Sequence, residues 1–98
     1  MVGGGSSASI NTAARAIVNA GIFLAAAAGN DNANAANSSP ANEPLVCTVG
    51  ATASNNARSS FSNYGAVVDI FAPGTSILST WIGSTSATVS FSTTFPAQ

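Results

Sequence analysis

The 98-residue chain contains no histidine and no lysine. Histidine is the usual general base near neutral pH, and lysine serves as base or nucleophile in the Ser-Lys and Schiff-base alternatives. Because both residue types are missing, the 98 residues by themselves cannot perform histidine-based or lysine-based catalysis.

Charged side chains are almost as scarce. They make up 5% of the chain and leave a net charge of -1, whereas solvated domains carry about a quarter charged residues. Without a basic field to attract phosphates, we expect no nucleic-acid partner. The low charge also predicts a piece of structure whose faces are covered by further protein. The charged residues are Arg15, Asp31, Glu43, Arg58 and Asp69.

Signals for export, membrane insertion and cross-linking are missing too. The opening MVGGGSSAS has neither the positive region nor the apolar run of a signal peptide, and no stretch approaches the ~18 apolar residues of a membrane span. We therefore expect no membrane partner. Cys47 is the only cysteine, so the chain cannot form an internal disulfide or a cysteine metal site. A lone cysteine is most often a small buried hydrophobe.

The first third of the chain has the pattern of a helix followed by a strand. Ser6 and Ser7 offer N-cap oxygens, and Gly21 can take the left-handed conformation that ends a helix. The continuous apolar run at residues 22–27 predicts a strand covered on both faces. Apolar residues at helical spacing lie between these signals, at Ile10, Ala13, Ala14, Ile17 and Val18.

Shorter elements are predicted downstream. Residues 29–44 are rich in Asn, Ser and Ala and contain two prolines, which is typical of a long loop. Apolar runs at residues 45–49, 67–71 and 77–81 predict three more strands. One helix with covered strands indicates an α/β fold. Residues 84–98 are rich in Ser and Thr without helical or strand period, so we predict an irregular tail there.

A candidate site follows the first predicted strand, in the sequence Ala27-Ala28-Gly29-Asn30. Its small residues allow another backbone to approach closely, and the Asn30 amide projects from the carboxyl end of the strand, where ligands bind in open α/β sheets. Gly-Asn is also a common turn dipeptide. On spacing alone, an ordinary turn is therefore the favoured interpretation of this segment over a ligand site.

Five segments carry a family resemblance. GGG, AAAAGNDN, EPLVCTVGA, SSFSNYG and DIFAPGTSILSTW occur in this order over residues 3–83. In order and separation they resemble the subtilisin-like serine proteases, in particular the proteinase K branch. The resemblance implies that residues 1–83 are part of a doubly wound, mainly parallel α/β catalytic domain. It leaves residues 84–98 outside the family pattern.

The resemblance also implies site residues. Asn30 matches the side-chain donor of the oxyanion hole, which stabilises charge on the scissile carbonyl. Ala27, Ala28 and Gly29 match one wall of the pocket for the substrate's P1 side chain. Gly3 matches the backbone strand that pairs with an extended substrate. The implied substrates are peptides or proteins, and the implied location is extracellular.

A calcium site is implied in the same way. The backbone carbonyls of Pro44 and Val46 and the carboxylate of Asp69 match its ligands, and calcium prefers oxygen donors. Taken without the resemblance, Asp69 is an ordinary solvated carboxylate at a strand end. Cys47 matches a half-cystine of the family whose partner is absent from this chain.

The chain departs from the family where the catalytic triad would be. The triad aspartate and histidine belong to family segments that precede this sequence, and the nucleophile would follow Trp81 in a Gly-Thr-Ser-Met-Ala setting. Ser92 falls near that position, but Phe91 and Thr94 replace the small residues of the tight turn, and no base is present. We therefore expect a protease fragment that is inactive alone. The alternative is a noncatalytic secreted module, peptide-binding or structural, on a degraded protease scaffold.

Overall fold

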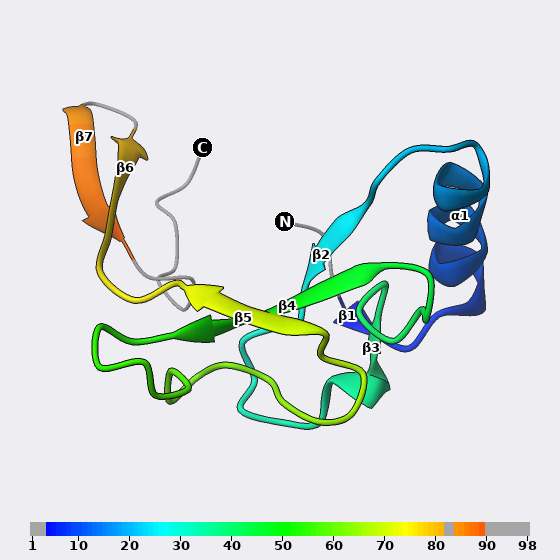
Figure 1. Ribbon diagram of the computed structural model, residues 1–98, viewed down its shortest axis with the longest axis horizontal. Helices are drawn as coiled ribbons and strands as arrows, with labels where there is room; N and C mark the ends of the chain where they lie inside the picture. The colour runs from blue at the N-terminus through cyan, green and yellow to red at the C-terminus, as the bar shows by residue number, and fades with distance from the viewer. Residues whose placement is uncertain (1–3, 82–83, 90–98) are drawn as a thin grey trace.

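A three-stranded parallel sheet lies at the centre of the molecule (Figure 1). The computed structural model describes residues 4–81 and 84–89. In these residues, one α-helix and a parallel central sheet confirm the predicted α/β class. The elements in chain order are β1 (Gly4–Gly5), α1 (Ala8–Asn19), β2 (Ala25–Ala27), the 3-10 helix η1 (Ala35–Asn37), β3 (Ser38–Ser39), β4 (Cys47–Thr52), β5 (Ile70–Pro73), β6 (Ile77–Trp81) and β7 (Ser84–Val89).

Helix α1 begins and ends where the sequence predicts. Ser7 is its N-cap, and the Ser7 Oγ accepts a hydrogen bond from the Ile10 N–H at 3.4 Å. Gly21 follows the helix with a φ of +85°, a conformation that suits glycine. Local capping signals therefore set both ends of this helix.

The central sheet is ordered β2-β4-β5, with all strands parallel. Ala25 pairs with Cys47 and Ala27 with Val49, while Val49 also faces Ile70 on the other side of β4. Parallel neighbours need long crossover connections. The crossover between β2 and β4 contains η1 and β3, and β3 pairs with β1 in a small antiparallel sheet.

Three predicted strands are shifted in the structure. The strand expected at residues 22–27 begins at Ala25, and Phe23, which precedes it, is 79% exposed. The strands expected at 45–49 and 67–71 occupy Cys47–Thr52 and Ile70–Pro73. Val67 and Val68 pack against a buried alanine cluster instead of joining the sheet. An apolar run marks residues that favour burial, but it does not determine the strand register.

The tail prediction is also wrong over Ser84–Val89, which forms β7 and pairs antiparallel with β6. The register joins Ile77 to Val89 and Leu78 to Thr88. A paired strand is stabilised by backbone hydrogen bonds to its neighbour, so it forms here without hydrophobic alternation in its own sequence. Residues 90–98, which include Ser92, lie outside the described residues.

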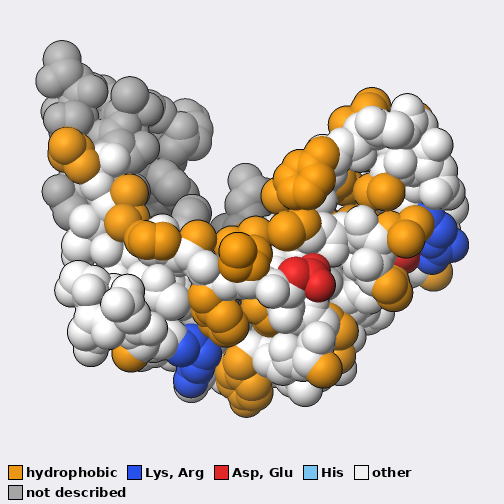
Figure 2. All heavy atoms as spheres, viewed as in Figure 1, with side chains coloured by type: hydrophobic (Ala, Val, Ile, Leu, Met, Phe, Trp, Pro, Cys, Tyr) orange, Lys and Arg blue, Asp and Glu red, His pale blue; other side chains and the backbone are white. Residues whose placement is uncertain are grey.

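The described part of the chain buries small residues and exposes several large ones. Ala28, Ala35 and Ala41 form one buried cluster. Figure 2 shows hydrophobic side chains in a band along the upper edge of the molecule, above the central sheet and toward β6. Within the described ranges, no helix has the length and hydropathy of a membrane span. The exposed large hydrophobic residues are Ile17, Ile22, Phe23, Leu45, Tyr64, Ile70, Phe71, Ile77 and Leu78.

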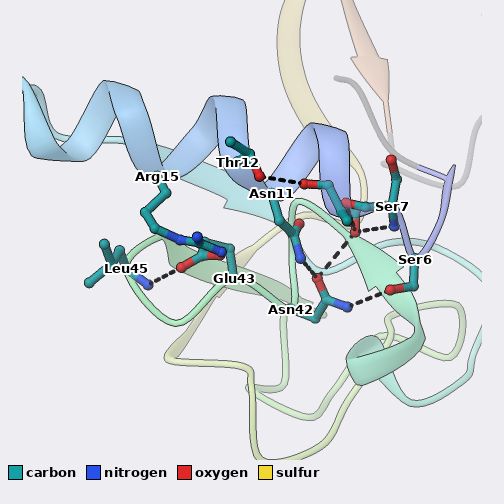
Figure 3. A network of polar contacts seen from close by, with 10 residues as sticks. Ser6, Ser7, Asn11, Thr12, Arg15, Asn42, Glu43 and Leu45 are labelled. Atoms are coloured by element: carbon teal, nitrogen blue, oxygen red, sulfur yellow. Dashed lines mark hydrogen bonds and ion pairs between the residues drawn. The ribbon is translucent and has the colours of Figure 1, made fainter.

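A polar network fastens α1 to the loop before β4 (Figure 3). Arg15 Nη2 donates to Glu43 Oε2 at 2.9 Å, and the Glu43 side chain is only 4% exposed. This hydrogen bond holds the pKa of Glu43 below its ordinary value and raises the pKa of Arg15. Asn11 Nδ2 donates to Asn42 Oδ1 at 2.8 Å in the same contact. The loop that leads into β4 is therefore held against the helix.

Candidate functional site

The chain turns sharply where β2 ends. Ala28 is almost fully buried, and its N–H donates to the Val49 carbonyl at 2.8 Å, which extends the contact with β4. Gly29 follows with a φ of +108°. Side chains with a Cβ are strained at such an angle, so the turn depends on glycine. The turn places Asn30 beyond the carboxyl end of the central sheet, as the sequence predicts.

A cavity of about 190 Å³ lies at this turn. It brings together Ala27, Ala28, Gly29 and Asn30, four of the residues predicted as a site. The side chain of Asn30 is the only polar one among the described residues that line it. The cavity therefore offers an apolar space of small residues with one amide at its edge. The lining residues are Ala25, Ala26, Ala27, Ala28, Gly29, Asn30, Val49, Gly50 and Ala51.

The β4 side of this cavity is absent from the sequence prediction. Val49, Gly50 and Ala51 reach the cavity because β4 pairs in parallel with β2. An ideal Cβ on Gly50 would lie 2.4 Å from the ring of Phe71, so this position admits no larger residue without displacement of the ring. The sequence identifies the apolar run of β4 but not the register in which β4 pairs with β2. That register is what brings Val49, Gly50 and Ala51 to the cavity.

Asn63 is a further residue that the sequence analysis did not identify. Its side chain is completely buried. Asn63 Nδ2 donates to the Ala28 carbonyl at 2.9 Å, and Asn63 Oδ1 accepts from the Asp31 N–H at 2.9 Å and the Ala33 N–H at 3.0 Å. The Asn63 N–H also donates to the Gly29 carbonyl at 2.9 Å. One side chain thus contacts the backbone on both sides of Asn30.

Arg58 supports the outer part of the same turn. Arg58 Nη1 donates to Asn32 Oδ1 at 3.0 Å and to the Ser62 carbonyl at 2.6 Å. Its guanidinium carbon lies 5.0 Å from the centre of the Tyr64 ring, within the range of a cation–π contact. Residues 28–33 are therefore held against residues 58–64 at several points.

The predicted calcium ligands lie near a second cavity, of about 230 Å³. Pro44 and Asp69 both line it, whereas Val46 is buried and is not part of its lining. The Thr48 N–H donates to Asp69 Oδ2 at 2.8 Å and orients the carboxylate. No group of three or more His, Cys, Asp or Glu residues suited to a metal occurs in residues 4–81 and 84–89. A cation here would depend on one carboxylate and backbone carbonyls, an oxygen donor set that fits calcium.

Two further positions singled out by the sequence, Cys47 and Gly3, are not among the described residues that line either cavity. Cys47 is a half-buried free cysteine in β4. Gly3 lies outside the described residues, so its predicted pairing with a substrate backbone stays a prediction.

Comparison with known proteins decides the family. The model of the subtilase family matches residues 2–98. The chain belongs to the subtilase family. The match includes residues 84–98, which the sequence analysis had set apart as a tail; the domain boundary at residue 83 stays a prediction.

This subtilase resembles fungal members of the proteinase K-like branch. It is 67% identical over 89 residues to the subtilisin-like serine protease AsES of Sarocladium strictum, a match that covers 91% of this chain and 23% of that protein. It is 69% identical over 81 residues to the cuticle-degrading protease of Metarhizium anisopliae, covering 83% of this chain and 21% of that protein. The chain therefore spans less than a quarter of the length of these relatives.

A solved structure supports the fold. The crystal structure of a cold-adapted subtilisin-like serine proteinase superposes with a TM-score of 0.88 at 46% sequence identity. The superposition covers 91% of this chain and 33% of that one. The expectation of a partial subtilisin-like fold is confirmed, and the arrangement of the turn at Asn30 can be interpreted within a subtilase.

Proposed function

We propose that this subtilase chain supplies the oxyanion-hole donor of a serine endopeptidase, and that Asn30 is that donor. The observation that carries the proposal is the position of Asn30, beyond the end of β2 and at the edge of an apolar cavity lined by small residues. When a serine attacks a peptide carbonyl, the carbonyl oxygen becomes negatively charged. A preorganised amide N–H at that point stabilises the transition state more than the substrate.

The substrate in this proposal is a peptide or protein. Ala27, Ala28 and Gly29 form one wall of the pocket for the P1 side chain, because their lack of bulk leaves room beside the scissile bond. Gly3 contributes backbone groups that pair with the extended substrate. Binding along these residues would hold the scissile carbonyl next to Asn30.

Peptide hydrolysis in this proposal requires polypeptide beyond these residues. A Ser-His-Asp triad needs a histidine, and none occurs among the 98 residues. Phe23, just before β2, is 79% exposed, and Leu78 in β6 is 72% exposed, which favours apolar surfaces that other parts of a catalytic domain would cover. We propose an extracellular protease domain as the setting.

The purified chain alone should give no turnover of a chromogenic peptide, and turnover that survives removal of contaminating proteases would contradict this.

Calcium has a structural part in the proposal. Asp69 would bind the ion through its carboxylate, and Pro44 and Val46 would bind it through their carbonyl oxygens. A bound calcium ion supplies charge neutralisation and cross-links the segments that hold its ligands. Pro44 and Val46 belong to the segment directly before β4, and Asp69 is the residue before β5, so the site would fix these two segments together.

The test of Asn30 uses a hybrid protease, in which residues 4–81 of this chain replace the aligned segment of the cuticle-degrading protease of Metarhizium anisopliae. Asn30→Leu keeps a similar volume and removes the donor. Loss of one such donor in a subtilisin lowers kcat by roughly 10²–10³, and we adopt that range as the expected effect, with KM nearly unchanged.

Asn37→Leu is the matched control, because Asn37 is an exposed asparagine of η1. The control should leave kcat and KM as they are in the parent hybrid. An Asn30→Leu hybrid with undiminished kcat would overturn the assignment of Asn30. A hybrid that folds but shows no activity would contradict the protease function proposed for the whole segment.

A further inference from the structure

We infer that Asn63 is a positioning residue for the oxyanion hole: its side-chain amide fixes the backbone on both sides of Asn30 and so aims the Asn30 amide. This inference rests on the proposed function of Asn30. Asn63 lies on the segment between β4 and β5, far from Asn30 in the sequence, and it acts through the backbone of the turn.

The hydrogen bonds of Asn63 carry the inference. An asparagine side chain can accept two hydrogen bonds at its oxygen and donate two from its nitrogen. Asn63 Oδ1 accepts from two backbone donors, the N–H groups of Asp31 and Ala33 at 2.9 and 3.0 Å. Asn63 Nδ2 donates to the Ala28 carbonyl at 2.9 Å. Because the amide group is planar, these three bonds fix the backbone before and after Asn30 relative to each other.

The turn at Gly29 packs so tightly against the Asn63 side chain that it cannot move closer to Asn63. The Asn63 side chain is 0% exposed, and an ideal Cβ on Gly29 would lie 2.4 Å from Asn63 Nδ2. The Asn63 N–H also donates to the Gly29 carbonyl at 2.9 Å. A buried polar side chain with several partners keeps its position, because each lost partner would leave a buried group unsatisfied.

Such rigidity matters more at an oxyanion hole than elsewhere. A donor stabilises the transition state only when it already points at the position of the developing charge. A misplacement of about 1 Å can lower the rate on the order of 10²-fold. A residue that holds the backbone of this donor therefore affects kcat, whereas a residue that only stabilises the fold affects the amount of folded enzyme.

The experiment compares two Asn63 variants in the hybrid protease. Asn63→Leu keeps a similar volume and removes all three side-chain hydrogen bonds. Asn63→Asp keeps the oxygen that accepts from Asp31 and Ala33, and it replaces the amide donor to Ala28 with a carboxylate oxygen, an acceptor that faces the Ala28 carbonyl. Active-site titration gives the concentration of folded enzyme, so that kcat and KM refer to competent molecules. Asn37→Asp and Asn37→Leu, at an exposed asparagine, are the matched controls.

We expect kcat to fall at least 10-fold in Asn63→Leu, to fall in Asn63→Asp as well because two acceptors then face each other at Ala28, and to stay unchanged in both controls, with KM nearly constant throughout. An unchanged kcat in folded Asn63→Leu, or a rise in KM alone, would overturn the inference. Failure of both variants to fold would also overturn it, because Asn63 would then stabilise the domain as a whole. The Asn30→Leu hybrid separates the two proposals: if it retains full kcat, the proposed function fails, and if only the Asn63 variants retain it, the inference alone fails.

Discussion

Substitution of Gly29 by alanine tests the geometry of the turn that carries Asn30. Gly29 has a φ of +108°, and a Cβ there would lie 2.4 Å from Asn63 Nδ2. A residue with a Cβ at positive φ costs about 1–3 kcal/mol in backbone strain. Displacement of Asn63 would break its bond to the Ala28 carbonyl and leave a buried group unsatisfied, at a further cost of about 1–3 kcal/mol. We therefore expect Gly29→Ala to lower the free energy of unfolding by about 2–6 kcal/mol, as the sum of these two costs.

Gly21 provides a matched control for the strain alone. Its φ is +85°, and no heavy atom lies within 4 Å of an ideal Cβ there. Gly21→Ala should therefore cost only the strain, about 1–3 kcal/mol. The assay is the denaturant midpoint of the hybrid protease, blocked with a serine-directed inhibitor to prevent self-digestion.

A double-mutant cycle isolates the contact between Gly29 and Asn63. In an Asn63→Ala background, the added methyl group meets no amide, so Gly29→Ala should cost no more than Gly21→Ala does. The reasoning would be refuted if Gly29→Ala and Gly21→Ala destabilised the parent equally, or if the cost of Gly29→Ala were the same in both backgrounds.

Two further predictions concern ionisable groups. The pKa of Glu43 lies below its ordinary value of 4.5 in the folded protein because Arg15 hydrogen-bonds it, so its contribution to stability is complete above pH 4.5 and is lost as the pH falls through the lowered pKa. Glu43→Gln should therefore be less stable than the parent hybrid at pH 7 and approach it in strong acid, and a constant difference between the two denaturant midpoints would contradict the Glu43–Arg15 contact. Asp69→Asn should reduce the rise in melting temperature that added calcium gives the parent hybrid, because it removes the carboxylate of the proposed site. The exposed Asp31→Asn is its control, and an undiminished calcium response in Asp69→Asn would exclude Asp69 as a ligand.

The sequence determined features that depend on neighbours along the chain. Helix α1 begins after Ser7 and ends before Gly21, as predicted. An N-cap side chain bonds within one helical turn, and tolerance of a positive φ is a property of glycine itself. The small residues before Asn30 were likewise visible, and the order of five sequence segments, of which they form part of one, carried the resemblance to subtilases.

Only the tertiary structure decided which strands pair and what holds the site. Strand β7 forms through its pairing with β6, and the register of β2 with β4 brings Val49 to the cavity. Asn63 reaches the Ala28 carbonyl across 35 residues of sequence. Hydrogen bonds between distant residues depend on how the whole chain folds back on itself, and an asparagine in a loop has no local pattern that shows which backbone groups it will bind. The sequence therefore identified Asn30 as a candidate donor, whereas the buried contacts of Asn63 show how its turn is held.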